Sequence, residues 1–197
     1  MADQTPFLLI LASGSPRRKA LLADINLSLK IVSTEVPEIP ERTETALSFS
    51  KRMARRKTEL VAAFYPDHWV LGADTIVVLD KRIFGKPSHS REAKKFLKAL
   101  SGKTHRVITS FCLIHRSRKT TVTRSVSTRV TFKSLSSQEI DWYIRTGEPL
   151  DKAGAYAIQG KGAFCVAKIH GSYTNVVGLP VTEVLETLGK YAGFRLG

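Results

Sequence analysis

The sequence predicts an α/β protein with an elongated, mixed β-sheet flanked by helices. In the first half of the chain, short apolar runs typical of strands alternate with segments of helical periodicity. Two long stretches rich in Thr, Val, Ile and Phe follow, at His105–His115 and Thr120–Phe132, and they favour an extended antiparallel ribbon. A long ribbon placed after an alternating pattern indicates a mixed sheet rather than a regular doubly wound fold.

The composition indicates one domain over residues 1–197 that can form a substantial core, because 43% of the residues are hydrophobic. No run approaches the roughly 18–20 apolar residues of a membrane helix, and the N-terminus lacks the basic lead of a secretory signal. We therefore expect a cytoplasmic protein. Cys112 and Cys165 lie in apolar, strand-like stretches, so we expect reduced core residues rather than metal ligands.

The net charge of +14 predicts attraction to anions such as nucleic acid or phosphorylated small molecules. Between Ala93 and Gln138 there is no Asp or Glu. This stretch is either a solvated basic face or a surface that attracts a polyphosphate or a nucleic acid. Aromatic residues are few there, so a platform for base stacking is poorly supported.

The N-terminal segment combines a predicted strand, a tight turn and two arginines. We expect a buried strand at Leu8–Ala12 and a helix from Pro16 to about Ile25, with Ser15 as the cap and Pro16 in the first turn. Free backbone N–H groups at a helix start, together with Arg17 and Arg18, form an anion site suited to phosphate. The alternative is an ordinary strand, turn and helix with solvated arginines.

A strand at Ser28–Ser33, a proline-broken loop at Glu35–Thr43 and a helix at Thr45–Phe64 are expected next. Trp69–Ala73 then predicts a buried strand that ends at Asp74. Loops at strand ends are where α/β proteins place their chemistry. A carboxylate at that position can bind Mg²⁺ or deprotonate a water, or it can simply cap a turn.

Asp80-Lys81 predicts a tight hairpin between strands at Ile76–Leu79 and Arg82–Phe84. Lys86 follows within Gly85-Lys86-Pro87, where the proline stiffens the backbone, so this lysine either neutralises a phosphate or is an exposed turn residue. A short helix is expected at Arg91–Leu100, ended by Ser101-Gly102.

In the last third, Ser136 and Glu139 have capping-box spacing and predict a helix at Ser136–Thr146. Pro149–Gly162 contains too many glycines for regular structure and predicts an ordered loop lining a cleft. The amide of Gln159 in that loop can read the planar edge of uracil or thymine, or it can satisfy loop backbone. The remaining expected elements are a strand at Gly162–His170 and a helix at Pro180–Tyr191. His105, His170, Ser172 and Asn175 are interpreted as structural or surface residues.

Taken together, these segments resemble the Maf family, also called septum-formation-inhibitor proteins. The motifs that carry the resemblance, in chain order, are Ala-Ser-Gly-Ser-Pro-Arg-Arg at 12–18, a Glu before the second helix, Lys57, Leu-Gly-Ala-Asp-Thr at 71–75, Gly-Lys-Pro at 85–87, Thr104-His105, and two late loops at Asp151–Gly162 and Gly171–Pro180. Each motif is weak alone, but their order and spacing are highly specific. The resemblance implies an inosine-triphosphatase-like fold with two lobes around a cleft, and activity as a nucleoside triphosphate pyrophosphatase.

The segment Asp-Lys-Ala-Gly-Ala-Tyr-Ala-Ile-Gln-Gly is similar to the branch of the family that hydrolyses dTTP and UTP. The resemblance makes Asp74 the proton acceptor in water attack on the α-phosphorus. It places Arg17, Thr75 and Gln159 on the base side, and Ser13, Arg18, Lys57 and Lys86 on the phosphate side. It also implies a divalent metal, Mg²⁺ or alternatively Mn²⁺, bound by Asp74 and by Glu38, which is chosen by counting back from Lys57 over the nearby Glu35 and Glu41. A homodimer is expected by the same resemblance.

Two other functions remain open from the sequence. The first is the same fold acting on 7-methyl-GTP or another purine triphosphate, against which Gln159 argues. The second is a binding protein whose basic surface engages nucleic acid or a cell-division partner. The sequence favours a pyrophosphatase for dTTP and UTP, including modified pyrimidine triphosphates.

Overall fold

A computed structural model describes residues 7–196. Seven strands form one mixed sheet in the order β2-β1-β3-β5-β6-β7, with β4 paired to β3. The strands are β1 (Leu8–Leu11), β2 (Ser28–Ile31), β3 (Trp69–Leu79), β4 (Arg82–Phe84), β5 (Thr104–His115), β6 (Thr120–Phe132) and β7 (Val166–His170). The helices are α1 (Pro16–Ala23), α2 (Ala46–Ala62), α3 (Ser90–Leu100), α4 (Ser137–Arg145), α5 (Tyr173–Val177) and α6 (Val181–Ala192). This arrangement confirms the predicted mixed sheet with flanking helices.

The described chain forms two compact units, and the chain first passes from one unit to the other between Asp74 and Thr75. The first unit contains the residues up to Asp74, together with Ser110–Ser125 and the residues from Gly178 onward. The second unit contains Thr75–Thr109 and Val126–Val177. Each unit has its own hydrophobic core.

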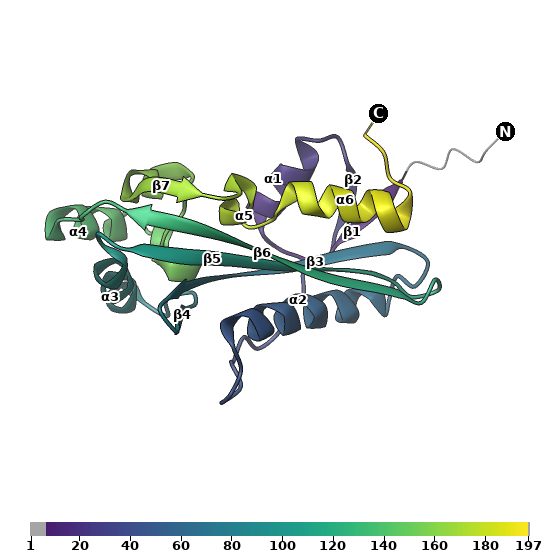
Figure 1. Cartoon of the computed structure of the whole chain (residues 1–197), viewed down its shortest axis with the longest axis horizontal. Coiled ribbons are helices and arrows are strands. Elements are labelled where there is room, and N and C mark those ends of the chain that lie inside the picture. The colour runs from purple at the N-terminus through teal and green to yellow at the C-terminus, as the bar shows by residue number, and fades with distance from the viewer. Residues whose placement is uncertain (1–6, 197) are drawn as a thin grey trace. The chain divides into compact units, whose positions relative to one another are not determined.

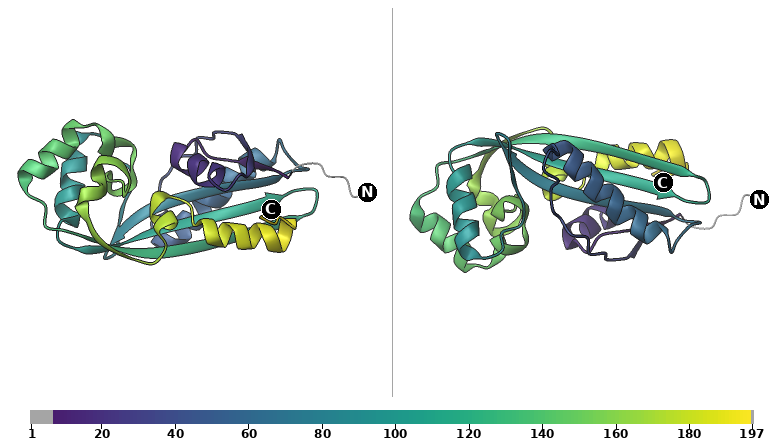
Figure 2. Two further views of the ribbon diagram at one scale, coloured as in Figure 1. Left: turned by 90° about the horizontal axis from the view of Figure 1, so that it is seen from above. Right: turned by 90° about the horizontal axis from the view of Figure 1, so that it is seen from below.

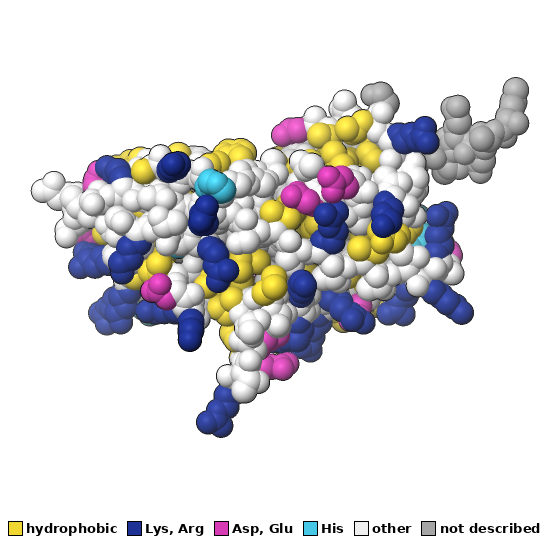
Figure 3. Space-filling view, viewed as in Figure 1, with side chains coloured by type: hydrophobic (Ala, Val, Ile, Leu, Met, Phe, Trp, Pro, Cys, Tyr) yellow, Lys and Arg dark blue, Asp and Glu magenta, His cyan; other side chains and the backbone are white. Residues whose placement is uncertain are grey.

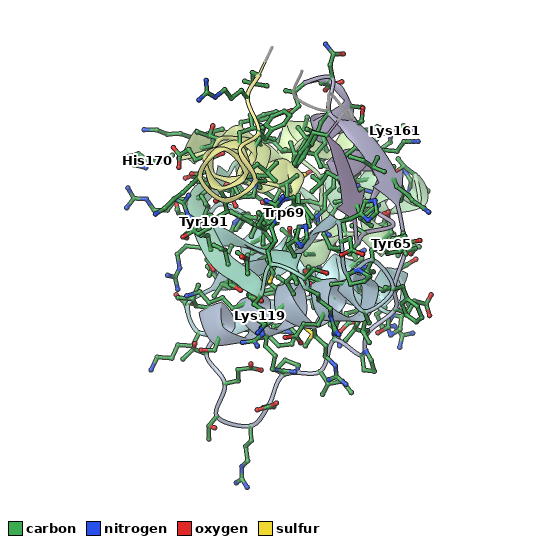
Figure 4. All side chains as sticks on the ribbon, turned by 90° about the vertical axis from the view of Figure 1, so that its right-hand side faces the viewer. Tyr65, Trp69, Lys119, Lys161, His170 and Tyr191 are labelled. Carbon is green, nitrogen blue, oxygen red and sulfur yellow. The ribbon has the colours of Figure 1, made fainter. Side chains whose placement is uncertain are left out.

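In the first unit, β1 pairs in parallel with both β2 and β3, as expected when helices connect successive strands. Figure 1 shows α2 against one face of this part of the sheet, and α1 and α6 against the other. Because both faces are covered at β1, this strand is an apolar run, and Leu9, Ile10 and Leu11 have no exposed surface. Trp69, which is labelled in Figure 4, begins β3 and packs edge-on against His115.

The strand that carries Asp74 is longer than predicted. We expected it to end at Asp74, but β3 continues through Asp74 and Thr75 to Leu79, where it turns into β4 by the predicted hairpin. The two polar residues suggested a strand end, yet both lie within the strand. Asp74 is therefore held by the ladder of a central strand rather than by a loop.

The second unit packs helices and short turns around its share of the ribbon. Its core includes Phe84, Phe96, Phe132 and Tyr143. Figure 2 shows α3, α4 and the segment that follows α4 gathered at one place. That segment is the predicted irregular loop, and it forms three short 3-10 turns at Glu148–Asp151, Ala153–Ala155 and Gly160–Cys165. The expected strand at Gly162–His170 is wrong at its start, because β7 begins at Val166.

The ribbon of β5 and β6 matches the prediction closely. Side-chain contacts pair Thr104 with Thr131, and Ser110 with Ser125. Residue numbers therefore increase along β5 as those of their partners on β6 decrease, which is the pattern of antiparallel strands. Cys112 and Cys165 are buried free thiols, as expected. No helix within the described residues is long and apolar enough to cross a membrane.

Candidate functional site

In the first unit, one ammonium group is shared by two carboxylates. Lys57 lies on α2, which begins after the capping residue Thr45. Its Nζ lies 2.7 Å from Asp74 Oδ1 and 2.7 Å from Glu38 Oε1. Glu41 instead pairs with Arg52, at 3.6 Å, so the geometry favours Glu38 among the candidate acidic residues. One lysine thus holds together the two carboxylates proposed for metal binding.

Asp74 is almost completely buried, with 4% of its surface exposed. Its Oδ2 is also buried and has no hydrogen-bond partner among the described residues. The Ser50 hydroxyl lies 3.3 Å from the backbone carbonyl oxygen of Asp74 and 2.8 Å from Ser110 Oγ, so its single proton can be donated to either acceptor. A buried carboxylate oxygen without a donor carries an energetic cost, which a bound cation or a water would relieve.

A close approach of helix α2 to strand β3 sets the position of Lys57. A Cβ atom added to Gly72 would lie 2.3 Å from Thr58 Oγ1 and 3.3 Å from the carbonyl oxygen of Ala54. The Thr58 hydroxyl donates to the carbonyl oxygen of Ala54 at 2.7 Å, and this hydrogen bond holds it against the strand at Gly72. Glycine at position 72 therefore lets α2 lie directly on the strand, and Lys57, the neighbour of Thr58, reaches Asp74.

The turn before α1 is organised by Ser13 rather than by Ser15. Ser15 occupies the N-cap position, but its side chain makes no capping hydrogen bond, which corrects the predicted cap. Ser13 Oγ instead accepts from the backbone N–H of Ser15 at 3.3 Å and from Arg18 Nη1 at 3.0 Å. Arg18 also donates through Nε to the carbonyl of Gly178 at 2.8 Å, so its guanidinium is held in one orientation.

The surrounding residues shift the pKa of Arg18. Burial lowers the pKa of Arg18, and the nearby positive charge of Arg17 acts in the same direction, whereas the negative charge of Asp74 opposes the shift. An arginine nevertheless stays protonated in proteins. The first unit therefore contains the charged side chains of Arg18, Lys57, Glu38 and Asp74, with the neutral Ser13 hydroxyl bound to Arg18. Arg17 and Arg18 are both partly exposed on α1.

In the second unit, Thr75 begins a buried hydroxyl chain. Its Oγ1 lies 2.9 Å from Thr109 Oγ1, and Thr109 donates its proton to the carbonyl of Asn175 at 3.0 Å. Thr75 must then be the donor to Thr109. Asn175 is fully buried and donates to Val107 O and Thr128 Oγ1, which confirms its predicted structural role.

Lys86 and Gln159 are both exposed side chains of the second unit. The turn of Lys86 is tied to the loop that precedes Gln159, because the carbonyl of Gly85 accepts from the N–H of Gly154 at 3.0 Å. Gly154 has a φ of +70°, and a Cβ atom there would lie 2.9 Å from Val77 Cγ2. This glycine is therefore needed for the two segments to meet.

The rings of His105, Phe132 and Tyr156 form a buried cluster that no local sequence pattern indicates. His105 contacts the hydroxyl of Tyr156 through Nε2 at 2.8 Å. Burial lowers the pKa of His105 to about 4, so the ring is neutral at neutral pH. The two residues are far apart in sequence, and no local pattern signals their contact. Of the two predicted interpretations of His105, structural or surface, its burial favours the structural one.

The acid-free stretch between Ala93 and Gln138 has acidic partners in three dimensions. Lys94 pairs with Asp141, Lys133 with Glu139, and Arg124 with Glu186 at 3.2 Å. Figure 3 shows Lys and Arg side chains spread over the visible face rather than gathered at one place. These observations favour the interpretation of this stretch as a solvated basic face.

Comparison with known proteins adds a family and its relatives. The profile of the family described as "Maf-like protein" matches residues 8–191. A "dTTP/UTP pyrophosphatase" of Myxococcus xanthus (strain DK1622) is 50% identical over 195 residues, which cover 99% of this chain and 96% of the relative. The "dTTP/UTP pyrophosphatase" of Bacillus cereus (strain AH187) is 46% identical over 183 residues, with 93% and 95% covered.

Solved structures are more distant in sequence. A nucleoside-triphosphatase, also described as a dITP/XTP pyrophosphatase, from Mycobacterium abscessus ATCC 19977 / DSM 44196 is 12% identical, with a TM-score of 0.47 over 95% of this chain and 97% of that chain. A likeness this distant has no bearing on the arrangement of the site.

Proposed function

This chain belongs to the Maf-like protein family, and from that premise we propose that it is a nucleoside triphosphate pyrophosphatase. It hydrolyses dTTP and UTP to the monophosphate and pyrophosphate, as the names of relatives that match almost its full length indicate. The observation that carries this function is the buried carboxylate of Asp74 with one oxygen held by Lys57 and the other without a donor among the described residues. That arrangement suits a group that accepts a proton beside bound phosphate.

Several cations of this chain are proposed to bind the triphosphate. Such a substrate carries about four negative charges, so its binding requires several positive groups. In the first unit we assign this role to Arg18 and Lys57, with Ser13 orienting Arg18 through the 3.0 Å hydrogen bond. In the second unit we assign it to Lys86. Arginine gives a fixed planar donor array, and lysine gives a mobile point charge.

In the proposed reaction, Asp74 takes a proton from the water that attacks the α-phosphorus. A bond forms between the water oxygen and the α-phosphorus, and the bond from that phosphorus to the bridging oxygen breaks. Pyrophosphate leaves with the bonding electrons, and the monophosphate remains. The remaining contribution of the protein is to position the reactants and to neutralise charge.

The residues present fit a divalent cation. Asp74 and Glu38 already share one positive charge, the ammonium of Lys57, and Asp74 Oδ2 is buried without a donor among the described residues. No group of three or more His, Cys, Asp or Glu side chains within residues 7–196 is arranged to hold a metal. Mg²⁺ usually takes one or two carboxylates together with substrate phosphates and waters. We therefore propose Mg²⁺, held by Asp74 and Glu38, which would draw electron density from the phosphate oxygens.

We expect the protein with Mg²⁺ to release pyrophosphate from dTTP and UTP in preference to other nucleoside triphosphates. A chelator such as EDTA should abolish the release, and added Mg²⁺ or Mn²⁺ should restore it. The measurement is pyrophosphate released from a panel of purine and pyrimidine triphosphates. Release confined to 7-methyl-GTP or another purine triphosphate would reject the pyrimidine assignment. If no triphosphate releases pyrophosphate, the proposed enzymatic activity is rejected, and a nucleic-acid-binding role for the basic surface is favoured.

We propose that Gln159, Thr75 and Arg17 select the nucleobase of the substrate. Thymine and uracil present acceptor, donor and acceptor groups along one edge, and one amide can make two hydrogen bonds to that edge. We also retain the homodimer and the cytoplasmic location as predictions, which sedimentation and cell fractionation test.

Replacing Gln159 with Ala should lower the preference for dTTP over dCTP. Two hydrogen bonds to the base contribute about 1–3 kcal/mol together, so we expect the ratio of kcat/KM values to fall about 5- to 150-fold. The dependence on Mg²⁺ should stay unchanged. The matched control is Gln138→Ala, which removes an exposed glutamine on α4 of the same unit. An unchanged dTTP/dCTP ratio in Gln159→Ala would reject the assignment of base reading.

A further inference from the structure

The carboxylate of Glu148 binds the loop that carries Gln159. Its Oε1 accepts hydrogen bonds from the hydroxyl of Tyr143 at 2.8 Å and from the backbone N–H of Gly162 at 2.9 Å. Its Oε2 accepts from the backbone N–H of Lys161 at 3.0 Å. Lys161, labelled in Figure 4, is exposed. The carboxylate of Glu148 binds its backbone N–H group.

Tyr143 extends this contact to the other side of Gln159. Its side chain is fully buried on α4, and its hydroxyl oxygen accepts from the backbone N–H of Ala157 at 3.2 Å. Backbone N–H groups at 157, 161 and 162 are therefore all bound by the pair of Glu148 and Tyr143. The exposed side chain of Gln159 lies between these anchored positions in sequence.

Two glycines allow the loop to approach the pair. Gly160 has a φ of +71°, and a Cβ atom there would lie 2.9 Å from Glu148 Oε2. A Cβ atom at Gly162 would lie 2.2 Å from the Tyr143 hydroxyl oxygen. Neither position can take a side chain without moving the loop or the pair. The glycines that suggested irregular structure in the sequence are thus fitted to these two polar side chains.

The protonation states match this arrangement. Partial burial opposes the charged form of Glu148, but the N–H of Lys161, the Tyr143 hydroxyl and the N–H of Gly162 outweigh it and lower its pKa. Burial raises the pKa of Tyr143, so its hydroxyl keeps its proton and donates to the carboxylate. A charged acceptor makes stronger hydrogen bonds than a neutral one.

We propose that Glu148, together with Tyr143, is a positioning residue that sets base selectivity by fixing the loop of Gln159. An amide presents a donor and an acceptor side by side, and it matches cytosine as well as thymine when it is turned over. Discrimination between these bases therefore requires that the amide keep one orientation, and an anchored loop favours this by limiting the side-chain conformations open to Gln159. This inference rests on the proposed role of Gln159 in the function above.

The experiment compares kcat/KM for dTTP and dCTP in Glu148→Gln and in the native protein. Glutamine has the size of glutamate but carries no charge and directs an N–H group at one of the loop N–H donors. Because the loss of one such hydrogen bond contributes about 1 kcal/mol, we expect the dTTP/dCTP ratio to fall about three- to tenfold. Glu139→Gln is the matched control. Glu139 also accepts a backbone hydrogen bond, from Ser136 at 2.8 Å, but on α4, and its removal should leave the ratio unchanged.

Two further variants test the positioning role independently of Glu148→Gln alone. Tyr143→Phe removes the hydroxyl alone and should lower the ratio in the same direction, and it decides the matter if Glu148→Gln does not fold. Adding Glu148→Gln to Gln159→Ala should change the ratio no further, because the carboxylate acts through Gln159. An unchanged ratio in both Glu148→Gln and Tyr143→Phe, where Gln159→Ala lowers it, would overturn the positioning role alone. An unchanged ratio in Gln159→Ala itself would overturn the base-reading role and this inference with it.

Discussion

Replacing Asp74 with Asn is expected to lower kcat for dTTP by about 10²–10⁴-fold, the contribution typical of a general base. Asparagine has the same shape, and its amide oxygen can still accept from Lys57, which lies 2.7 Å from Asp74 Oδ1. The amide cannot accept a proton from water at neutral pH. The measurement is steady-state pyrophosphate release with saturating Mg²⁺, together with thermal unfolding to establish that the variant is folded.

The control for this substitution is Asp141→Asn. Asp141 also pairs with a lysine, Lys94, but both side chains are more than one third exposed. Surface ion pairs contribute little to stability, so this variant should retain native turnover and a native unfolding midpoint. If Asp74→Asn keeps its turnover within about threefold of the native rate, Asp74 is not the base.

Gly72→Ala is expected to lower both stability and activity. The added Cβ atom would lie 2.3 Å from Thr58 Oγ1, and rotation of that side chain does not relieve the 3.2 Å approach to the Thr58 backbone nitrogen. Overpacking of this kind costs about 1–3 kcal/mol. For a chain of this size, the loss corresponds to a fall of about 2–4 °C in the unfolding midpoint per kcal/mol.

The loss of activity should exceed the loss of stability. Helix α2 must move away from β3 to accept the methyl group, and Lys57 moves with it. A displacement of about 1 Å in a group that binds the reacting phosphates can cost about 10²-fold in rate. Turnover should therefore fall even at temperatures where the variant is fully folded, as measured by pyrophosphate release and circular dichroism on the same sample.

Gly189→Ala is the matched control in the same unit. Gly189 lies inside α6, and a Cβ atom there would meet the carbonyl oxygen of Phe194 at an ordinary 3.5 Å. Alanine is favoured over glycine in a helix by about 1 kcal/mol, so this variant should be slightly more stable and equally active. A Gly72→Ala variant that behaves like Gly189→Ala would show that α2 does not depend on this close approach.

Features determined by neighbours in sequence could be predicted well. The capping box of α4 is visible as Ser136 and Glu139 three residues apart, and both of its hydrogen bonds are present. The hairpin around Asp80-Lys81 and the long alternation of β5 and β6 are equally local signals. The family resemblance is confirmed by the match over residues 8–191.

Features determined by distant partners could not be predicted from local patterns. The polarity of Asp74 and Thr75 predicts a strand end, but their environment comes from Lys57, Ser50 and Thr109. The assignment of Lys57 depends on the resemblance alone. Glu148 has no signal in the sequence, because a single carboxylate beside a glycine-rich loop gives no sign of which backbone groups it will bind.

The sharing of Lys57 between Glu38 and Asp74 has a consequence for how the resting protein meets its substrate. The lysine is the counter-ion of both carboxylates, so in the role proposed for it an arriving phosphate would compete with Glu38 and Asp74 for the ammonium group. Binding is then an exchange of partners, in which the gain from each new contact is offset by the loss of an old one. Such an exchange weakens the hold on any free phosphate or pyrophosphate that brings no compensating positive charge. With the phosphate-binding role proposed for Lys57, the contact that keeps the acidic pair together would also favour release of the product.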